Sequence, residues 1–288
     1  NLELTETLRG DVKGSLLGTL DYTITPMGKR LLRQWVSQPL LELVKIHNRQ
    51  NGVEYFFNTS MTRAELRNAL KPLADLERLT NRILSGHAQP RDMVALRETL
   101  GRIPTIQNNL PSSASPIQAT LDLLTPCLDE FTLLNTSISE DPPATLQNTG
   151  IIRSGYSAEL DGVIDASAHA REWINNLESI ERERTGIKTL KVGYNKVFGY
   201  YLEISAGQAA NAPSNYIRKQ TLVNAERYIT PEMKEYETLV LNAEERIREI
   251  ELRLFKEICA TLSKSTQKLL NTARSPGRIG GIRGLHAT

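Results

Sequence analysis

The residues best suited to chemistry lie in a basic, aromatic stretch from Thr185 to Tyr228. From Gly186 to Tyr228, six Lys and Arg stand against two Glu, so this stretch carries 6 − 2 = +4, while the whole chain carries +2. Lys and Arg donate hydrogen bonds to phosphate oxygens, and such contacts bind nucleic acid without reading its sequence. Phosphate contact is therefore the first chemistry that this stretch could perform.

Aromatic residues are also concentrated here, with six of the 9 + 5 + 2 = 16 Tyr, Phe and Trp of the chain. They are Tyr194, Phe198, Tyr200, Tyr201, Tyr216 and Tyr228. Such side chains could stack on the bases of a single strand. We favour the alternative that they form the core of a small sheet, because such a sheet has little else to bury.

Other kinds of site find little support in the sequence. Cys127 and Cys259 lie far apart in helical patterns, which gives no disulfide framework and suits a reducing cytoplasm. The four histidines lack metal-ligand spacing, and Gly28-Lys29-Arg30 lacks the upstream glycine and the following hydroxyl residue of a phosphate loop. The glycines after residue 274 form no dinucleotide-binding fingerprint.

The composition is that of an ordinary soluble globular protein, with 40% hydrophobic and 24% charged residues. No apolar run approaches the length of a membrane span, so we expect no membrane partner. The sequence starts with Asn and not Met, and we therefore expect an excerpt from a longer protein.

Short strands are expected to position the basic residues. Apolar residues alternate at 188–194 and 199–205, which predicts two strands joined by a hairpin turn at 195–198. A third strand is expected at 216–223, after a loop that contains Pro213.

Long helices are expected on both sides of these strands. A helix over 157–184 has apolar residues at a 3,4 spacing if Ser167 occupies one seam position. After the strands, Thr230-Pro231-Glu232 supplies an N-cap, a proline at the first helical position and an acidic first turn. Seven seam residues follow at steps of 3 and 4: Met233, Tyr236, Val240, Ala243, Ile247, Ile250 and Leu254. This pattern predicts a coiled-coil-like pair of antiparallel helices, the second running to about Leu270.

The remaining patterns predict an irregular helical bundle. Helices are expected from Thr25-Pro26 to Pro39, and at about 41–58, 61–69, 73–84, 91–103 and 121–134. Ser275 to Thr288 is rich in Gly and Pro, so we expect an irregular tail, with truncation, sequence error or a cloning artefact as candidate origins. Deleting that tail should then leave the melting temperature unchanged.

Several separate motifs in one order resemble a known family. LKVGYNKVFGYYLE at 190–203, YIRKQTL at 216–222 and NAERYITPEMKEYE at 224–237 resemble the clamp of the MutS family of bacterial DNA mismatch-repair proteins. Supporting segments are SLLGTLD at 15–21, TPMGKRLL at 25–32, Trp35 to Leu40, DLER at 75–78 and EDPP at 140–143. The resemblance covers residues 1 to about 274.

The resemblance implies a mainly α fold: an irregular helical bundle and a long antiparallel helical stalk that carries a small antiparallel β clamp insertion. The core or lever domain would be 1–155, completed by the returning helix 243–274. The clamp insertion would be 156–242, with its β tip at about 186–229. The resemblance also implies a cytoplasmic protein that binds double-stranded DNA by its backbone, forms a dimer when intact and acts with downstream mismatch-repair proteins.

This fragment is expected to be non-catalytic and to hold no cofactor, whereas the intact protein would be an ATPase using ATP and magnesium. By matching position, the candidate DNA contacts are Asn195 and Lys196 at the hairpin turn, and Arg218, Lys219 and Asn224 on the third strand. No contact is assigned to Val223, where some relatives carry a basic residue. Each candidate could instead be a solvated surface side chain that contacts no DNA. This alternative is stronger for Lys188 and Lys191.

Two other functions stay open. The chain could be a helical protein-interaction module in which the long helical pair binds a partner and the basic tip is incidental. It could also be the same region of a MutS paralogue that acts in recombination, although the branch without a clamp is disfavoured by Thr185 to Tyr228.

Overall fold

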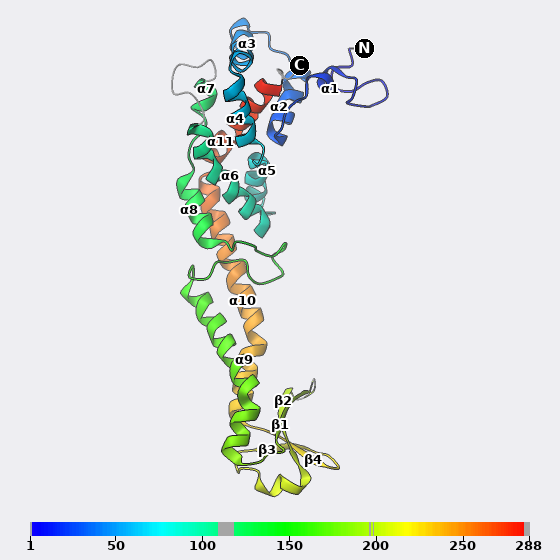
Figure 1. Ribbon diagram of the computed structural model, residues 1–288, viewed down its shortest axis with the longest axis vertical. Helices are drawn as coiled ribbons and strands as arrows, with labels where there is room; N and C mark the ends of the chain where they lie inside the picture. Colours follow the sequence, from blue (N-terminus) through cyan, green and yellow to red (C-terminus); the bar gives the residue numbers. More distant parts are fainter. Residues whose placement is uncertain (1, 109–117, 196, 198, 285–288) are drawn as a thin grey trace. The chain divides into compact units, whose positions relative to one another are not determined.

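The chain forms two compact units in a computed structural model that describes residues 2–108, 118–195, 197 and 199–284 (Figure 1). The first unit comprises Asn1–Leu146, Gly150–Arg153 and Leu254–Thr288, and the second comprises Gln147–Thr149 and Ser154–Arg253. The expectation of a mainly helical fold with a small antiparallel sheet is confirmed. The expected clamp insertion, 156–242, lies inside the second unit.

The first unit is an irregular helical bundle. Its elements are α1 (Leu16–Leu20), α2 (Pro26–Ser37), α3 (Leu43–Asn58), α4 (Ser60–Leu70), α5 (Leu76–Leu84), α6 (Pro90–Asn108), α7 (Gln118–Leu121), α8 (Leu128–Ser137), the last part of α10 (Pro231–Lys264) and α11 (Thr266–Gly284). Thr25 caps α2 as predicted, since its hydroxyl accepts a hydrogen bond from the amide of Gly28 at 3.1 Å. The single helix expected at 121–134 is wrong. Pro126 lies in the gap between α7 and α8, and proline disfavours helix in the residue before it.

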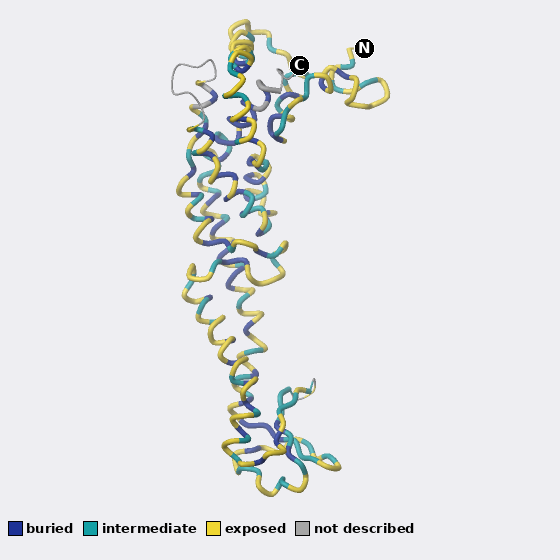
Figure 2. Tube along the Cα trace, in the orientation of Figure 1, coloured by how far each residue is buried: buried dark blue, intermediate teal, exposed yellow. Residues whose placement is uncertain are grey.

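The core of this unit draws on helices from both ends of the chain. Buried members of one cluster are Phe56, Leu66, Leu70, Leu73, Ile103, Ile106, Leu124 and Ile279. Figure 2 shows these buried stretches along the inner sides of the bundle. Ile279 is fully buried, so α11 belongs to the core.

The expectation of an irregular tail is therefore wrong for residues 275–284, which continue α11. Gly277 and Gly281 lie one turn apart, and a Cβ on either would contact Met27 at 3.4 Å or Trp35 at 3.5 Å. These small residues let α11 pack closely against α2. Burial of this face outweighs the helix propensities, which cost about 1 kcal/mol for Gly and about 3 kcal/mol for Pro276. Residues 285–288 of the expected tail lie outside the described part.

The returning helix was expected to run unbroken to about Leu270, and this expectation is wrong. α10 ends at Lys264, and Ser265 separates it from α11. The hydroxyls of Ser263 and Thr266 donate to the carbonyl oxygens of Cys259 at 2.8 Å and Ser263 at 2.6 Å. Such side-chain bonds compete with the helical pattern and explain the interruption.

The second unit consists of α9 (Ala158–Thr185), a four-stranded sheet, a short 3₁₀ helix (Ala206–Asn211) and the first part of α10. The two helices run antiparallel, because Trp173 stacks on Tyr236 with ring centroids 4.2 Å apart while Arg171 pairs with Glu244 at 3.1 Å. The predicted seam is confirmed on both helices. Its buried members are Leu160, Ser167, Ala170, Ile174 and Leu177 on α9, and Met233, Ala243, Ile250 and Leu254 on α10.

The sheet has the order β1-β2-β4-β3, and all its neighbouring strands are antiparallel. Its strands are β1 (Lys191–Asn195), β2 (Gly199–Ser205), β3 (Ile217–Thr221) and β4 (Ala225–Ile229). The first predicted strand began too early, because 188–190 form a turn after α9. The sequence analysis missed β4, whose central residues Glu226 and Arg227 are charged and find cross-strand partners only in the folded sheet.

One face of the sheet packs on the helices. The buried cluster there comprises Leu177, Ile187, Leu190, Leu202, Ile204, Tyr216, Tyr228, Ile229 and Met233. Tyr200 packs against this cluster, whereas residue Tyr194 is 53% exposed. Core packing is thus the role of most described aromatics of the stretch. Phe198 lies outside the described residues.

Candidate nucleic-acid interface

The four candidate DNA contacts that the structure describes, Asn195, Arg218, Lys219 and Asn224, are spread over two edges and two ends of the sheet. β1 and β3 are the outer strands. Asn195 pairs with Gly199 at the tip of the first hairpin, whereas Asn224 lies in the turn at the opposite end, beside the Ser205–Ala225 pair. The fold therefore does not gather the candidates into one cluster. Lys196 lies outside the described residues.

Arg218 and Lys219 lie on the outer strand β3, where three consecutive residues are exposed. The pairing with β4 shifts register between Arg218 and Gln220, so Lys219 is the extra residue of a β-bulge. Bulges and lysines on outer strands also prevent pairing with other sheets, which gives Lys219 a structural reason to be here.

Arg218 is partly neutralised by its neighbours. Its guanidinium lies 3.4 Å from the carboxylate of Glu226, which also accepts a hydrogen bond from the Tyr228 hydroxyl at 2.6 Å. That hydrogen bond, with help from Arg218, lowers the pKa of Glu226, and burial together with the Glu226 contact raises the pKa of Tyr228 to about 12. Lys219 forms no ion pair within the described part of the chain, so it offers an uncompensated charge.

The two asparagines have different surroundings. The side-chain oxygen of Asn195 accepts a hydrogen bond from the amide of Val197 at 2.7 Å, which is a local turn bond. The backbone oxygen of Asn224 accepts from the amide of Ala206 at 3.0 Å, and the residue is exposed. Asn195 is thus held by the turn, whereas the Asn224 amide group faces solvent.

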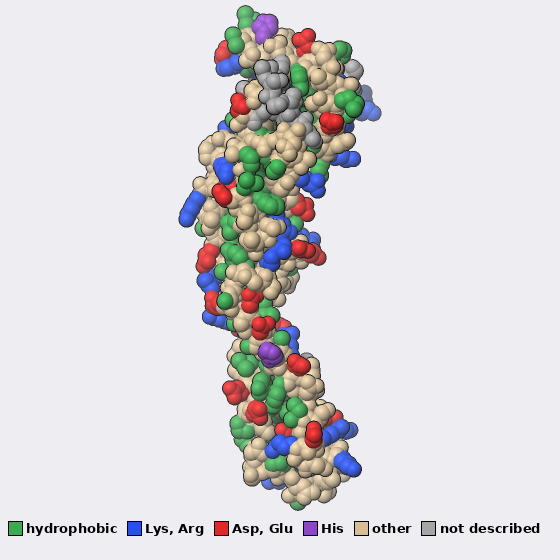
Figure 3. Space-filling model, turned by 60° about the vertical axis from the view of Figure 1, so that its left-hand side comes forward, with side chains coloured by type: hydrophobic (Ala, Val, Ile, Leu, Met, Phe, Trp, Pro, Cys, Tyr) green, Lys and Arg blue, Asp and Glu red, His purple; other side chains and the backbone are tan. Residues whose placement is uncertain are grey.

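Arg227 had been counted toward the positive charge of the stretch, but the structure neutralises it. Its guanidinium donates to Glu203 at 2.8 Å and to the side-chain oxygen of Gln220 at 3.0 Å, and it lies 4.3 Å from the centroid of the Tyr201 ring. The bond to Glu203 raises the pKa of Arg227. The cations left without a carboxylate partner in the described sheet region are Lys188, Lys191 and Lys219, all exposed. Figure 3 shows Lys and Arg side chains on the surface of this part of the second unit.

Two carboxylates bind backbone amides of the sheet, and no sequence pattern predicted these contacts. Glu178 of α9 accepts from the amide of Val192 at 3.0 Å, and Glu237 of α10 accepts from the amide of Tyr200 at 3.1 Å. Glu237 is the last residue of the NAERYITPEMKEYE segment, so the motif contained it without showing its contact.

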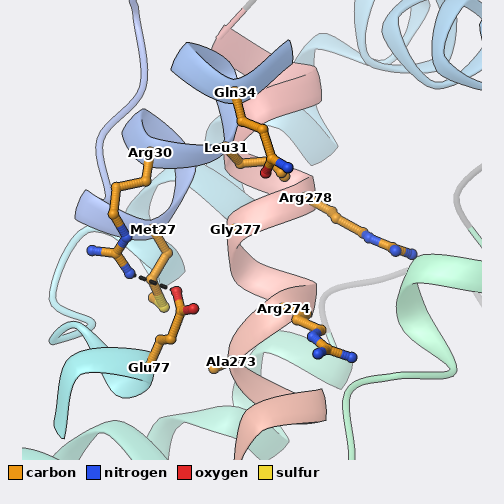
Figure 4. A pocket seen from close by; sticks show the side chains of 9 residues that line it. All are labelled: Met27, Arg30, Leu31, Gln34, Glu77, Ala273, Arg274, Gly277 and Arg278. Atoms are coloured by element: carbon orange, nitrogen blue, oxygen red, sulfur yellow. Dashed lines mark hydrogen bonds and ion pairs between the residues drawn. The ribbon is translucent and has the colours of Figure 1, made fainter. Parts of the chain in front are cut away.

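A hollow of about 540 Å³ in the first unit lies between α2 and α11 (Figure 4). Its one carboxylate, Glu77, is held by Arg30 at 2.7 Å. The lining residues are Met27, Arg30, Leu31, Gln34, Glu77, Ala273, Arg274, Gly277 and Arg278, which supply no nucleophile with an adjacent base. The described residues contain no group of three or more side chains able to hold a metal ion, and no described helix is long and apolar enough to cross a membrane.

Comparison with known families decides the affiliation. The model of MutS domain III matches residues 1–279. The chain belongs to the MutS domain III family.

Individual relatives agree with this assignment. The chain is 44% identical over 284 residues to the DNA mismatch repair protein MutS of Acetivibrio thermocellus, covering 97% of this chain and 32% of the relative. It is 45% identical over 275 residues to the DNA mismatch repair protein MutS of Dehalococcoides mccartyi, covering 95% of this chain and 32% of the relative. This MutS domain III chain thus spans about a third of the length of the curated relatives it matches.

Proposed function

We propose that this MutS domain III chain is the DNA-clamp and lever region of a mismatch-repair ATPase. The second unit grips the backbone of duplex DNA without sequence specificity, and the first unit links that grip to an ATPase domain of the intact protein. The observation that carries the proposal is the set of exposed, unpaired lysines around the sheet, Lys188, Lys191 and Lys219, in a chain of this family.

The chemistry of these groups suits backbone contact. Lysine is a point charge on a flexible stem, and it binds phosphate without the planar geometry that a base edge demands. Arg218 and Asn224 add donors on the β3 side of the sheet, and the first hairpin adds Asn195 and Lys196. Contacts of this kind fix a protein on the duplex and carry no sequence information.

The remaining roles belong to the intact protein. We propose that it is a cytoplasmic ATPase that uses ATP and magnesium, acts as a dimer and works with downstream mismatch-repair proteins. The fragment itself performs no catalysis in this proposal. Its task is mechanical: α9 and α10 transmit the effect of DNA binding at the sheet to the first unit.

Fluorescence anisotropy with a labelled duplex over a salt series tests the grip. If about three lysines engage phosphates, log K plotted against log salt should fall with a slope of about −2.7, from about −0.9 for each contact. Lys219→Glu should weaken binding equally for matched and mismatched duplexes, because phosphate contacts do not report the mispair.

Lys256→Glu is the matched control, since Lys256 is exposed on the part of α10 that belongs to the first unit. It makes the same change in net charge away from the sheet and should leave affinity close to that of the parent. Binding that ignores salt, or equal losses in both variants, would refute the sheet as the contact surface. No binding to duplex DNA would favour the protein-interaction alternative.

A further inference from the structure

The β1–β2 hairpin has backbone groups that no neighbouring strand covers. β2 pairs with β4 only from Leu202 to Ser205, so Gly199 to Tyr201 have no paired residue on β4. β1 is an outer strand along its whole length. The hairpin tip therefore projects with a free edge on each side. A free edge leaves amide groups that need hydrogen-bond acceptors and leaves the hairpin free to bend.

A carboxylate from a different helix covers each edge. Glu178 of α9 accepts from the amide of Val192 on the β1 side, and Glu237 of α10 accepts from the amide of Tyr200 on the β2 side, at 3.0 and 3.1 Å. The two amides belong to neighbouring pairs of the same kind in the β1–β2 ladder. Val192 pairs with Leu202, and Tyr200 pairs with Tyr194, two residues further along. In an antiparallel pair, amides two residues apart point to the same side of their strand. Both bonds thus take up amides that point away from the hairpin's own ladder.

The Glu237 contact is closely fitted. Its residue is 5% exposed, and a Cβ added to Gly199 would lie 1.5 Å from the carboxylate oxygen Oε1. Gly199 also has a φ of +78°, a backbone conformation that residues other than glycine rarely adopt. Lys234, one turn away on α10, pairs with the second oxygen of Glu237. Only glycine fits at this point of the hairpin while the carboxylate holds the next amide.

The Glu178 contact is fixed in a similar way. Arg182, one turn along α9, pairs with Glu178 at 2.8 Å, and its Nε donates to the carbonyl oxygen of Leu190 at 2.7 Å. The arginine thus ties both the carboxylate and the chain entering β1 to the same helix. A backbone amide that donates to a carboxylate makes a stronger hydrogen bond than one that donates to a neutral group.

We propose that Glu178 and Glu237 are positioning residues for DNA binding, which hold the β1–β2 hairpin in one direction relative to α9 and α10. The end of the hairpin at the Asn195–Gly199 pair then meets the DNA backbone at a fixed place, and no ordering of the two strands is needed when DNA binds. The inference rests on the proposed function, because the hairpin is useful in this way only if the sheet contacts DNA.

The test uses the full chain and two readouts. Glu237→Ala removes the acceptor, Glu237→Gln retains a side-chain oxygen, and Glu235→Ala is the control, being an exposed carboxylate on the same helix with the same charge change. The first readout is the rate of amide hydrogen exchange in the hairpin, followed by NMR without DNA. We expect Tyr200 exchange to rise about tenfold or more in Glu237→Ala, to rise less in Glu237→Gln and to stay unchanged in Glu235→Ala.

Duplex binding by anisotropy is the second readout. We expect Glu237→Ala to bind several-fold more weakly with a shallower salt slope, because fewer phosphate contacts form at once. Glu178→Ala should show the same pattern and serves as an independent variant if Glu237→Ala fails to fold. A parent that binds DNA, together with variants that bind equally well, would overturn the positioning role. A parent that does not bind DNA would instead overturn the proposed function itself, and unchanged Tyr200 exchange would show that the carboxylate does not hold the hairpin.

Discussion

Replacing Ile279 by Ala tests whether α11 completes the first unit. Ile279 is fully buried in a cluster with Phe56, Leu66 and Ile103. Truncating a buried Ile to Ala removes its apolar contacts and leaves a cavity, which costs about 2–5 kcal/mol. In a unit of this size, about 1 kcal/mol lowers the melting temperature by about 2–4 °C, so we expect a decrease of about 4–20 °C.

Thermal unfolding followed by circular dichroism measures this change, with urea unfolding as the second measurement. Arg278→Ala is the control, because Arg278 is the exposed neighbour on the same helix and its loss should change stability by less than about 0.5 kcal/mol. The same reasoning predicts that deleting residues 275–288 destabilises the chain, contrary to the expectation for an irregular tail. If Ile279→Ala unfolds with the midpoint of the parent, α11 does not pack here and the tail is irregular after all.

Two further predictions concern the helical pair and an internal ion pair. Ile250→Asp should lower the free energy of unfolding by several kcal/mol, measured with urea, because it places a charge at a residue that is 2% exposed. Ile247→Asp should lower it less, because Ile247 is only half-buried. Equal urea midpoints for Ile250→Asp and the parent would contradict the seam. Burial alone would raise the pKa of Glu130, but hydrogen bonds from Ser265 and Lys268 outweigh it and lower the pKa. A lowered folded-state pKa gives stability that is present above the unfolded value of about 4.3 and is lost as the pH falls through the folded value. Glu130→Gln should therefore be less stable than the parent at neutral pH and lose less stability between about pH 5 and pH 3, while a parallel loss in both proteins would show that Glu130 does not titrate in this way.

Local signals in the sequence were enough to place most helices and one strand. Thr25 and Pro26 determine the start of α2 because the capping hydroxyl and the missing proline amide act within one helical turn. The seam of α9 and α10, Ser167 included, follows from periodicity, which reports which face of a helix is buried. The family, too, could be identified from motifs alone, since the matching segments keep their order along the chain.

Tertiary structure decided what depends on partners distant in sequence. α11 continues through Pro276 because Ile279 packs in a cluster with Phe56 and Ile103, and the glycines at 277 and 281 face α2; local propensity contains no information about that burial. β4 forms because Glu226 pairs with Arg218 on β3 and Arg227 pairs with Glu203 on β2.

The candidate site shows the same division. Composition located the positive charge at 186–228, but a count cannot tell a compensated cation from a free one. Arg227 is neutralised by Glu203, 24 residues away, while Lys219 keeps its charge exposed at a bulge that no local pattern marks. The contacts of Glu178 and Glu237 with the hairpin are equally invisible in the sequence, because each joins a helix to a strand amide 14 or 37 residues away. Charge and hydrophobic periodicity can be taken from the sequence. The neutralisation of a cation and the direction of the hairpin arise only when the fold brings the groups within hydrogen-bonding distance.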